Sequence, residues 1–246
     1  MRLQNKVCVI TGGASGIGQA CALRYAQEGG AVVVADINEV GGEAVAAQIR
    51  ANNGRAVFQR TDVSEPAQLD ALLKRAVDEY GDVHVWHNNA FKSVFKTIVE
   101  QTLQEFDDTV RISLRAYWYG SKIAVTHMLA HNGGVIINTA SVQSYFGEPG
   151  FSAYQTAKGG ILSLTRSIGV DHAPKVRAVA LAPGFIITPA HDGIPAETIE
   201  RVKASIPAKR GAQPEEVAAL AAFLASDEAD YITATGIIMD GGYLGI

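Results

Sequence analysis

Short apolar runs alternate along the whole chain with longer stretches whose apolar residues recur at helical spacing. Most of the short runs are almost continuously apolar and β-branched, which is typical of strands in a parallel sheet covered on both faces. We predict strands at Val7–Ile10, Ala31–Ala35, Ala56–Gln59, Val83–His87, Val135–Asn138, Val176–Leu181 and Ile237–Met239. We predict helices at Gly16–Glu28, Val40–Ala51, Pro66–Tyr80, Leu103–Ala130, Ala153–His172 and Pro214–Ala225.

The regular alternation of strand and helix predicts the fold class. Successive strand–helix–strand units join by right-handed crossovers into a parallel sheet. We therefore expect an α/β protein with a Rossmann-type, doubly wound, seven-stranded parallel sheet and helices on both faces. No repeat or linker divides the sequence, so residues 1–246 are expected to form a single domain. The proline-containing segment at about 185–212 interrupts the alternation, and a loop of that length is often a lid.

The composition limits the kinds of molecule that the protein is expected to bind. The 246 residues are 48% hydrophobic and 19% charged, which excludes a disordered chain, and the net charge of −4 argues against nucleic acid as a partner. The two cysteines, Cys8 and Cys21, are expected to be buried, reduced thiols. The sequence shows no signal peptide and no apolar stretch of the roughly 18 residues that a membrane span needs, so we expect a cytoplasmic protein without a membrane partner.

A glycine-rich turn, Thr11–Gly18, follows the first predicted strand and opens a helix near Gly16. Glycines there let the backbone turn tightly beside a pyrophosphate, and the helix N-terminus attracts its charge. Asp36 ends the second strand, where its carboxylate can bond both hydroxyls of an adenosine ribose and repel a 2′-phosphate. Its neighbours Ser15 and Ile37 are uncharged, which favours NAD over NADP. The alternative is that Asp36 only caps the turn that follows.

A second group of residues has the side chains that proton transfer requires. Tyr154 and Lys158 share one helical face, and Ser141 ends the fifth strand. A phenol has a pKa of about 10, so it needs a nearby cation to act as a base at neutral pH. Because ligands of open α/β sheets bind at the carboxyl ends of the strands, the following residues should share one crevice: Gly12–Gly18, Asn88, Asn89, Ala90, Ser141, Pro183 and Gly184.

These motifs together resemble the short-chain dehydrogenase/reductase family over the whole length of the chain. The resemblance rests on the following residues: the turn Thr11–Gly18 as TGxxxGxG, Asp62 and Val63, Asn88 to Ala90, Ser141, Tyr154 with Lys158, Pro183 and Gly184 with Thr188, and the ending Asp240 to Tyr243. The resemblance implies an NAD(P)-dependent enzyme that interconverts alcohols and ketones in a single dinucleotide-binding and catalytic domain. It also implies a homo-oligomer, a dimer or a tetramer.

The resemblance assigns roles residue by residue. It implies that Tyr154 is the acid/base, that Ser141 holds the substrate oxygen, and that Lys158 binds the nicotinamide ribose and lowers the tyrosine pKa. Asp62 and Val63 would hold the adenine. The full set that it implies for the cofactor is Gly12, Ser15, Gly16, Ile17, Gly18, Asp36, Asp62, Val63, Asn89, Ala90, Tyr154, Lys158, Pro183, Gly184, Ile186 and Thr188.

Two positions depart from the family pattern. Phe91 stands where the family usually has glycine, and it either forms a wall of the substrate pocket or packs elsewhere. Ser113 stands where the family commonly has an asparagine that holds a water in the proton relay. A serine hydroxyl is shorter and lacks the paired donor and acceptor of an amide, so Ser113 either supports the relay through water or marks a slower enzyme.

Five residues that follow the strands are expected to line the substrate side: Phe91, Val142, Gln143, Tyr145 and Phe185. This set is mostly apolar and aromatic, with Gln143 as a polar handle, which favours a neutral secondary alcohol or ketone, alicyclic or aromatic. Lys92 keeps an acidic substrate possible. His127 and His131 have the i, i+4 spacing of metal ligands, but no third ligand is evident beside them, so no metal is expected.

The sequence therefore favours an NAD-dependent alcohol dehydrogenase, with two alternatives. One is an NADPH-dependent 3-oxoacyl-thioester reductase, which Asp36 opposes. The other is a dinucleotide-binding module that has lost catalysis. Ser113 and Phe91 motivate that reading, and the intact Ser141, Tyr154 and Lys158 oppose it.

Overall fold

The computed structural model describes residues 1–245, and its centre is one seven-stranded sheet. All neighbouring strands are parallel, in the order β3-β2-β1-β4-β5-β6-β7, which confirms the predicted fold. The strands are β1 Val7–Thr11, β2 Ala31–Asp36, β3 Arg55–Arg60, β4 Val85–Asn88, β5 Gly134–Thr139, β6 Val176–Pro183 and β7 Thr235–Met239. The order reverses between β1 and β4, and such a switch point is where open α/β sheets bind ligands.

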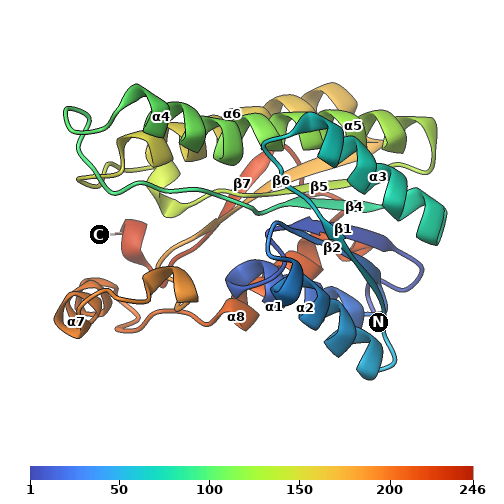
Figure 1. Cartoon of the computed structure of the whole chain (residues 1–246), viewed down its shortest axis with the longest axis horizontal. Coiled ribbons are helices and arrows are strands. Elements are labelled where there is room, and N and C mark those ends of the chain that lie inside the picture. Colours follow the sequence, from blue (N-terminus) through green and yellow to red (C-terminus); the bar gives the residue numbers. More distant parts are fainter. Residues whose placement is uncertain (246) are drawn as a thin grey trace.

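Helices cover both faces of this sheet (Figure 1). The helices are α1 Gly16–Gln27, α2 Glu39–Ala51, α3 Pro66–Tyr80, α4 Leu103–Val110, α5 Ala116–Ala130, α6 Ser152–His172, α7 Ala196–Ser205 and α8 Pro214–Leu224. Side chains alternate between the faces of each strand, so Cys8 and Ile10 pack beneath α1, α2 and α8, whereas Val9 packs beneath α3 and α5. Both cysteines are buried free thiols, as expected.

The predicted helix Leu103–Ala130 is interrupted. Thr102 caps α4 in a reciprocal capping box with Glu105, but a π-helical turn, Arg111–Arg115, separates α4 from α5. Such wide turns often occur at functional sites. Ser113 lies buried in this turn, so the interruption falls at one of the two positions that depart from the family pattern.

The segment at about 185–212 is more ordered than a loop, because it contains a short 3-10 turn, Pro189–His191, and helix α7. Its two ends are joined by backbone hydrogen bonds from Ile187 to Ala212 (2.9 Å) and from Ala212 to Phe185 (3.0 Å). The body of the segment extends away from the sheet (Figure 1). Among residues 1–245, no helix has the length and apolar character needed to cross a membrane.

Candidate active site

The glycine-rich turn is packed too closely for side chains. A Cβ on Gly18 would lie 2.0 Å from the carbonyl oxygen of Gly12, and one on Gly12 would lie 2.8 Å from the Cα of Ala90. Gly12 and Gly16 also have positive φ angles of 67° and 53°. Ser15 precedes α1 without capping it through its side chain, so the first N–H groups of the helix stay available to an anion.

Asn89 clamps the end of β4 to this turn. Its side-chain amide donates to the carbonyl oxygens of Thr11 (3.1 Å) and Gly12 (3.2 Å). In return, the Thr11 hydroxyl accepts from the backbone N–H groups of Asn89 (3.0 Å) and Ala90 (3.3 Å). The two strands at the switch point therefore hold the phosphate-binding turn in a fixed shape.

Asp36 lies beside the same turn, at the end of β2. Its carboxylate accepts from the backbone N–H of Ala14 (2.9 Å) and from that of Asn38 (2.9 Å), while the adjacent Ile37 is exposed. Asp62 orders its own turn after β3 by accepting from the N–H of Ser64 (2.9 Å), and Val63 packs against the core. Asp36 thus ends β2 and Asp62 follows β3, so the two carboxylates stand at the carboxyl ends of neighbouring strands.

The other side of the crevice comes from the chain after β6. Gly184 donates to the carbonyl oxygen of Met239 (2.9 Å), and a Cβ on Gly184 would lie 2.9 Å from Asp240. Ile186 is buried, and the Thr188 methyl lies close enough to Gly16 that an added Cβ there would sit 3.4 Å from it. Pro183 ends β6 and Ile17 packs against the core. This cradle of backbone and small residues fits a dinucleotide.

The predicted catalytic residues converge. Ser141 follows β5, and its hydroxyl accepts from the N–H of Gln143 (3.2 Å) and is hydrogen-bonded to the Tyr154 phenol. Lys158, one helical turn beyond Tyr154, is fully buried. Its ammonium donates to the carbonyl oxygen of Thr139 (2.6 Å) and lies 5.6 Å from the centre of the Tyr154 ring.

Burial dominates the protonation of this pair. It raises the pKa of Tyr154 to about 12, and the hydrogen bond from Ser141 lowers it only in part. Burial also lowers the pKa of Lys158 to about 7. The Lys158 ammonium donates to the Thr139 carbonyl in this structure, and the lowering of the tyrosine pKa by Lys158 stays a prediction. Additional negative charge beside Lys158 would favour its charged form.

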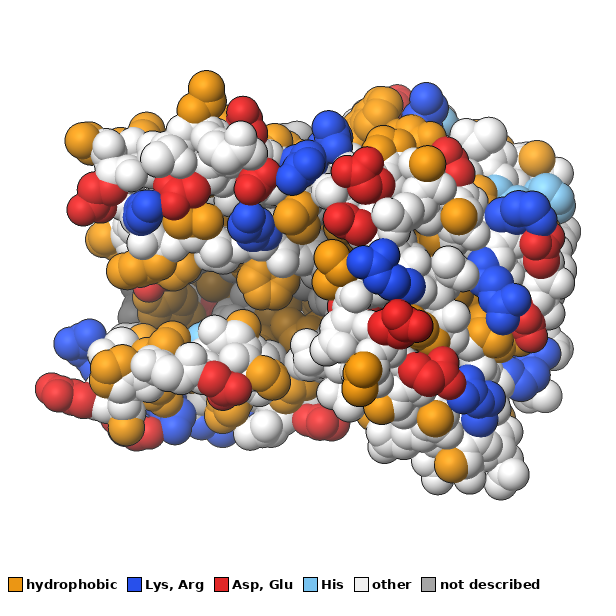
Figure 2. Space-filling view, in the orientation of Figure 1, with side chains coloured by type: hydrophobic (Ala, Val, Ile, Leu, Met, Phe, Trp, Pro, Cys, Tyr) orange, Lys and Arg blue, Asp and Glu red, His pale blue; other side chains and the backbone are white. Residues whose placement is uncertain are grey.

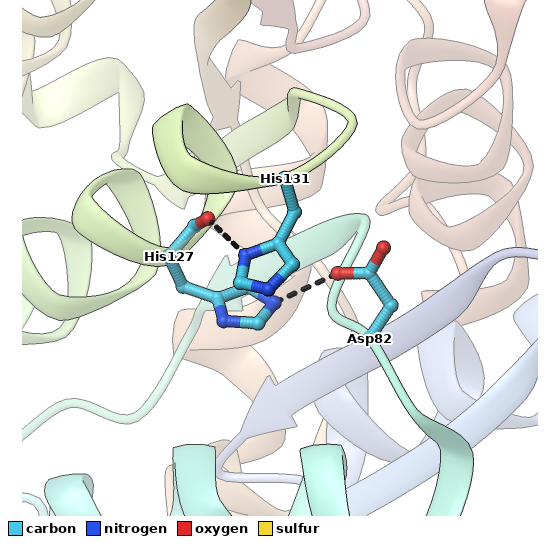
Figure 3. Close-up of side chains that lie close together, drawn as sticks. All are labelled: Asp82, His127 and His131. Atoms are coloured by element: carbon cyan, nitrogen blue, oxygen red, sulfur yellow. Dashed lines mark hydrogen bonds and ion pairs between the residues drawn. The ribbon is translucent and has the colours of Figure 1, made fainter.

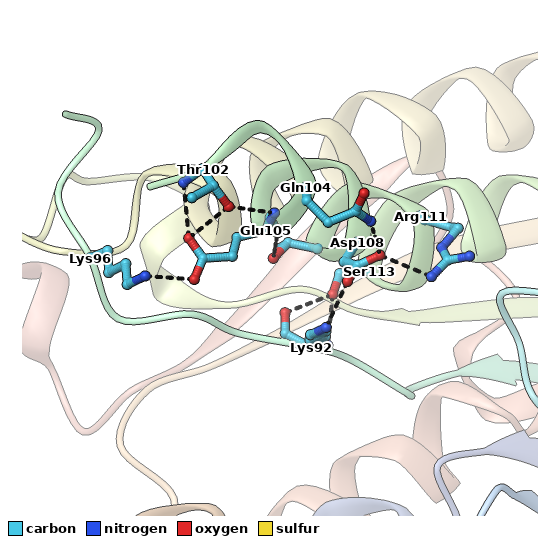
Figure 4. Close-up of polar contacts among 9 residues, drawn as sticks. Lys92, Lys96, Thr102, Gln104, Glu105, Asp108, Arg111 and Ser113 are labelled. Carbon is cyan, nitrogen blue, oxygen red and sulfur yellow. Dashed lines mark hydrogen bonds and ion pairs between the residues drawn. The ribbon is translucent and has the colours of Figure 1, made fainter. Parts of the chain in front are cut away.

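Ser113 is engaged with the loop that follows β4 (Figure 4). Its hydroxyl accepts from the backbone N–H of Lys92 (2.9 Å) and donates to the carbonyl oxygen of the same residue (3.0 Å). The Lys92 ammonium pairs with Asp108 (3.0 Å), and that of Lys96 pairs with Glu105 (2.6 Å). Ser113 therefore helps to fix this loop against α4, a role that its replacement of asparagine did not indicate.

Aromatic rings surround Tyr154. The ring of Phe91 lies edge-on to it at 6.1 Å, and the ring of Phe151 lies at the same distance. Phe95 packs edge-on against Phe151 at 5.0 Å. Phe91 is half exposed and lies 5.6 Å from the Lys158 ammonium, so it forms a wall above the catalytic residues. The surface is hollowed between α4 and the α7 segment, with hydrophobic side chains in its depth (Figure 2).

The other residues predicted to line the substrate side differ in how close they lie to the catalytic residues. Val142 is buried beside Ser141. Gln143 donates to Glu148, while its buried side-chain oxygen has no hydrogen-bond partner among residues 1–245. Tyr145 instead places its hydroxyl over Gly236 of β7, and Phe185 packs against His191, with ring centres 4.8 Å apart. The structure thus brings Phe91 and Gln143 to the catalytic residues more directly than Tyr145 or Phe185.

A chain of buried polar side chains that the sequence did not reveal lies beneath the site. The two ring nitrogens of His87 lie 2.9 Å from the Tyr25 hydroxyl and 2.9 Å from the Thr139 hydroxyl. The Thr139 hydroxyl also donates to Asn89 (3.3 Å), and the Thr139 carbonyl accepts from Lys158. Phe151 was missed as well. The only signal for His87 is an isolated histidine in an apolar strand.

The cradle, the tyrosine–lysine pair and the fold define an oxidoreductase of the dinucleotide-binding class, and comparison with known proteins agrees. A family model described as enoyl-(acyl carrier protein) reductase matches residues 12–244. The cyclohexanol dehydrogenase of an Acinetobacter species is 36% identical over 98% of this chain and 96% of its own. The 3-oxoacyl-[acyl-carrier-protein] reductase of Thermotoga maritima is 34% identical over 98% and 99%.

A solved structure agrees equally well. The crystal structure of gox2181 matches with a TM-score of 0.96 and 27% identity, covering 100% of this chain and 98% of that one. The chain therefore belongs to the short-chain dehydrogenase/reductase family, whose members use nicotinamide dinucleotide cofactors.

Proposed function

We propose that this protein oxidises a neutral alicyclic secondary alcohol to the ketone with NAD. The observation that carries the proposal is the group of aromatic rings around Tyr154: Phe91 and Phe151 pack against it and make the surroundings of the phenol suitable for an apolar ring. Similarity to a cyclohexanol dehydrogenase supports the same substrate class.

The residues would act as follows. The Ser141 hydroxyl holds the substrate oxygen, and the Tyr154 phenolate takes the hydroxyl proton as the carbonyl forms. The bound nicotinamide supplies the hydride acceptor. Lys158 favours the phenolate electrostatically when it is charged. Since burial holds the tyrosine pKa at about 12, the positive charge of Lys158, and that of the nicotinamide ring when NAD⁺ is bound, would favour the phenolate that the reaction needs.

We propose NAD as the cofactor because Asp36 stands where a 2′-phosphate of NADP would meet a carboxylate. Both of its oxygens are already fixed by backbone N–H groups, so the carboxylate has little freedom to turn aside. The exposed neighbour Ile37 offers no positive charge to compensate.

The second candidate is an NADPH-dependent 3-oxoacyl-thioester reductase, which similarity to the Thermotoga enzyme favours. A panel of cyclohexanol, acyclic secondary alcohols and a 3-oxoacyl thioester, each with both cofactors, separates the two proposals. Turnover of cyclohexanol with NAD⁺ supports the first. If the thioester is reduced, and only with NADPH, the second candidate function replaces the first. Cofactor binding without turnover of any substrate would favour the module that has lost catalysis.

A further inference from the structure

Three potential metal ligands meet far from the active site (Figure 3). His127 lies in the last turn of α5 and His131 is the residue that caps its end, and their rings are stacked 4.1 Å apart. Asp82 comes from the turn between α3 and β4, about 45 residues earlier in the chain. The ligand atoms of the three residues all lie within 4.8 Å of one another. The third ligand that the sequence does not reveal is therefore supplied by tertiary structure.

The orientation of each group suits coordination. The Nδ1 of His131 lies 2.8 Å from the carbonyl oxygen of His127, and only a protonated nitrogen can bond a carbonyl. That bond leaves the Nε2 of His131 with a free lone pair. Metal-binding histidines are commonly oriented in this way, by a carbonyl oxygen that accepts from the ring nitrogen not bound to the metal. The Nε2 of His127 lies 2.7 Å from the Oδ1 of Asp82.

The carboxylate is also held in place. Asp82 accepts from the backbone N–H of Val83 (2.7 Å) and from the side-chain amide of Asn132 (3.3 Å). A hydrogen-bonded pair of His127 and Asp82 would stabilise the helix end without His131. His131 goes beyond that pair, because its ring stacks on His127 and its free nitrogen lies within 4.8 Å of the ligand atoms of His127 and Asp82. The three side chains can therefore bind one ion together.

We propose that Asp82, His127 and His131 form a binding site for a divalent transition metal, zinc being the most available. Two imidazoles and one carboxylate suit Zn²⁺, Co²⁺, Ni²⁺ or Cu²⁺, whereas Mg²⁺ and Ca²⁺ prefer oxygen ligands alone. The ion takes the place of the proton between His127 and Asp82, and that proton is released to solvent. Exposure of His131 leaves room for water to complete the coordination.

The location predicts a structural role. Asp82 precedes β4, whereas Asn89, Ser141 and the other active-site residues follow the opposite, carboxyl ends of the strands. A bound ion would tie the end of α5 to the start of β4. Metal should therefore raise the thermal unfolding midpoint in a concentration-dependent way and leave the turnover rate unchanged.

The test uses the full chain without a histidine tag, treated with chelator and then titrated with Zn²⁺ in a calorimeter. We expect one equivalent to bind. His131→Gln and Asp82→Asn should each raise the dissociation constant by at least about tenfold. The matched control is His172→Gln, at the end of α6, which should bind as the parent does. Visible absorption bands of bound Co²⁺ provide a second readout that should disappear in the same two variants.

His131 is exposed and its side chain bonds only the backbone of its own helix, so His131→Gln should fold. The proposal is overturned by an absence of saturable binding, by unchanged binding in His131→Gln, or by an equal loss in the His172 control. A thermal shift of the same size with Mg²⁺ would also overturn it.

Discussion

His87 offers a sharp test because it is fully buried and both of its ring nitrogens are hydrogen-bonded. His87→Leu fills the buried position with an apolar side chain and leaves the buried Tyr25 hydroxyl without its hydrogen-bond partner. An orphaned buried group costs about 1–3 kcal/mol, and the lost bond to Thr139 adds about 1 kcal/mol. We expect the free energy of unfolding to fall by about 2–4 kcal/mol. Tyr25→Phe alone should cost about 1–3 kcal/mol by the same argument.

The double variant tests the reasoning. When both partners become apolar, no buried polar group of that pair is left unpaired, so the combined loss should be smaller than the sum of the single losses. Urea unfolding at constant ionic strength measures all four proteins, and equal m-values confirm that only stability has changed. Strictly additive losses would refute the claim that these two side chains stabilise each other.

The acid dependence of stability gives an independent check on His87. Burial lowers its pKa from 6.5 to about 3, so between these values the unfolded chain binds a proton that the folded chain does not. Stability therefore falls as the pH drops from 6.5 towards 3, by up to about 1.4 kcal/mol per pH unit from this group. The unfolding free energy of His87→Leu should depend less steeply on pH in this window. An identical slope would show that other groups cause the acid sensitivity.

Three further changes probe the cofactor turn, the loop and cofactor choice. Gly18→Ala places a Cβ against the Gly12 carbonyl, so we expect a stability loss of about 1–3 kcal/mol and weaker NADH binding, measured by thermal unfolding and fluorescence titration; unchanged binding would contradict the tight packing. Ser113→Ala removes both bonds to the Lys92 backbone and should cost about 1–2 kcal/mol and raise the KM for the alcohol; an unchanged KM would mean that the loop does not shape the pocket. Asp36→Ser removes the carboxylate, so the ratio of kcat/KM for NADP⁺ to that for NAD⁺ should rise at least about tenfold; an unchanged ratio would sink the proposed role of Asp36.

The sheet could be predicted because its evidence is local. Near-continuous apolar runs identify buried parallel strands, and the glycine-rich turn and the Tyr154 helix occur next to the strands that position them. Strand boundaries moved by at most two residues, as at β4, where predicted Val83–His87 became Val85–Asn88. Local apolar spacing says nothing about which backbone groups pair at a strand end, so such shifts are expected.

The parts that sequence missed depend on contacts between distant residues. The π-helical turn around Ser113 keeps a helical spacing of apolar residues, so the sequence pattern does not distinguish it from an α-helix, and the bond from Ser113 to Lys92 joins residues far apart in the chain. Phe151 precedes the Tyr154 helix directly, but its packing against Phe95 of the loop after β4 joins residues far apart in the chain. Asp82 joins His127 across 45 residues. Each of these contacts is fixed by the tertiary fold, and the spacing of apolar residues along the sequence does not reveal it.

The most direct measurement of the central claim compares the parent enzyme with Tyr154→Phe. Cyclohexanol oxidation is followed by NADH absorbance, and NADH binding is measured separately by fluorescence. The phenyl ring keeps the contacts with Phe91 and Phe151 but has no proton to exchange. We expect turnover to fall at least about a hundredfold while NADH binding is nearly unchanged. Turnover close to that of the parent, with NADH still bound, would contradict the assignment of Tyr154 as the acid/base.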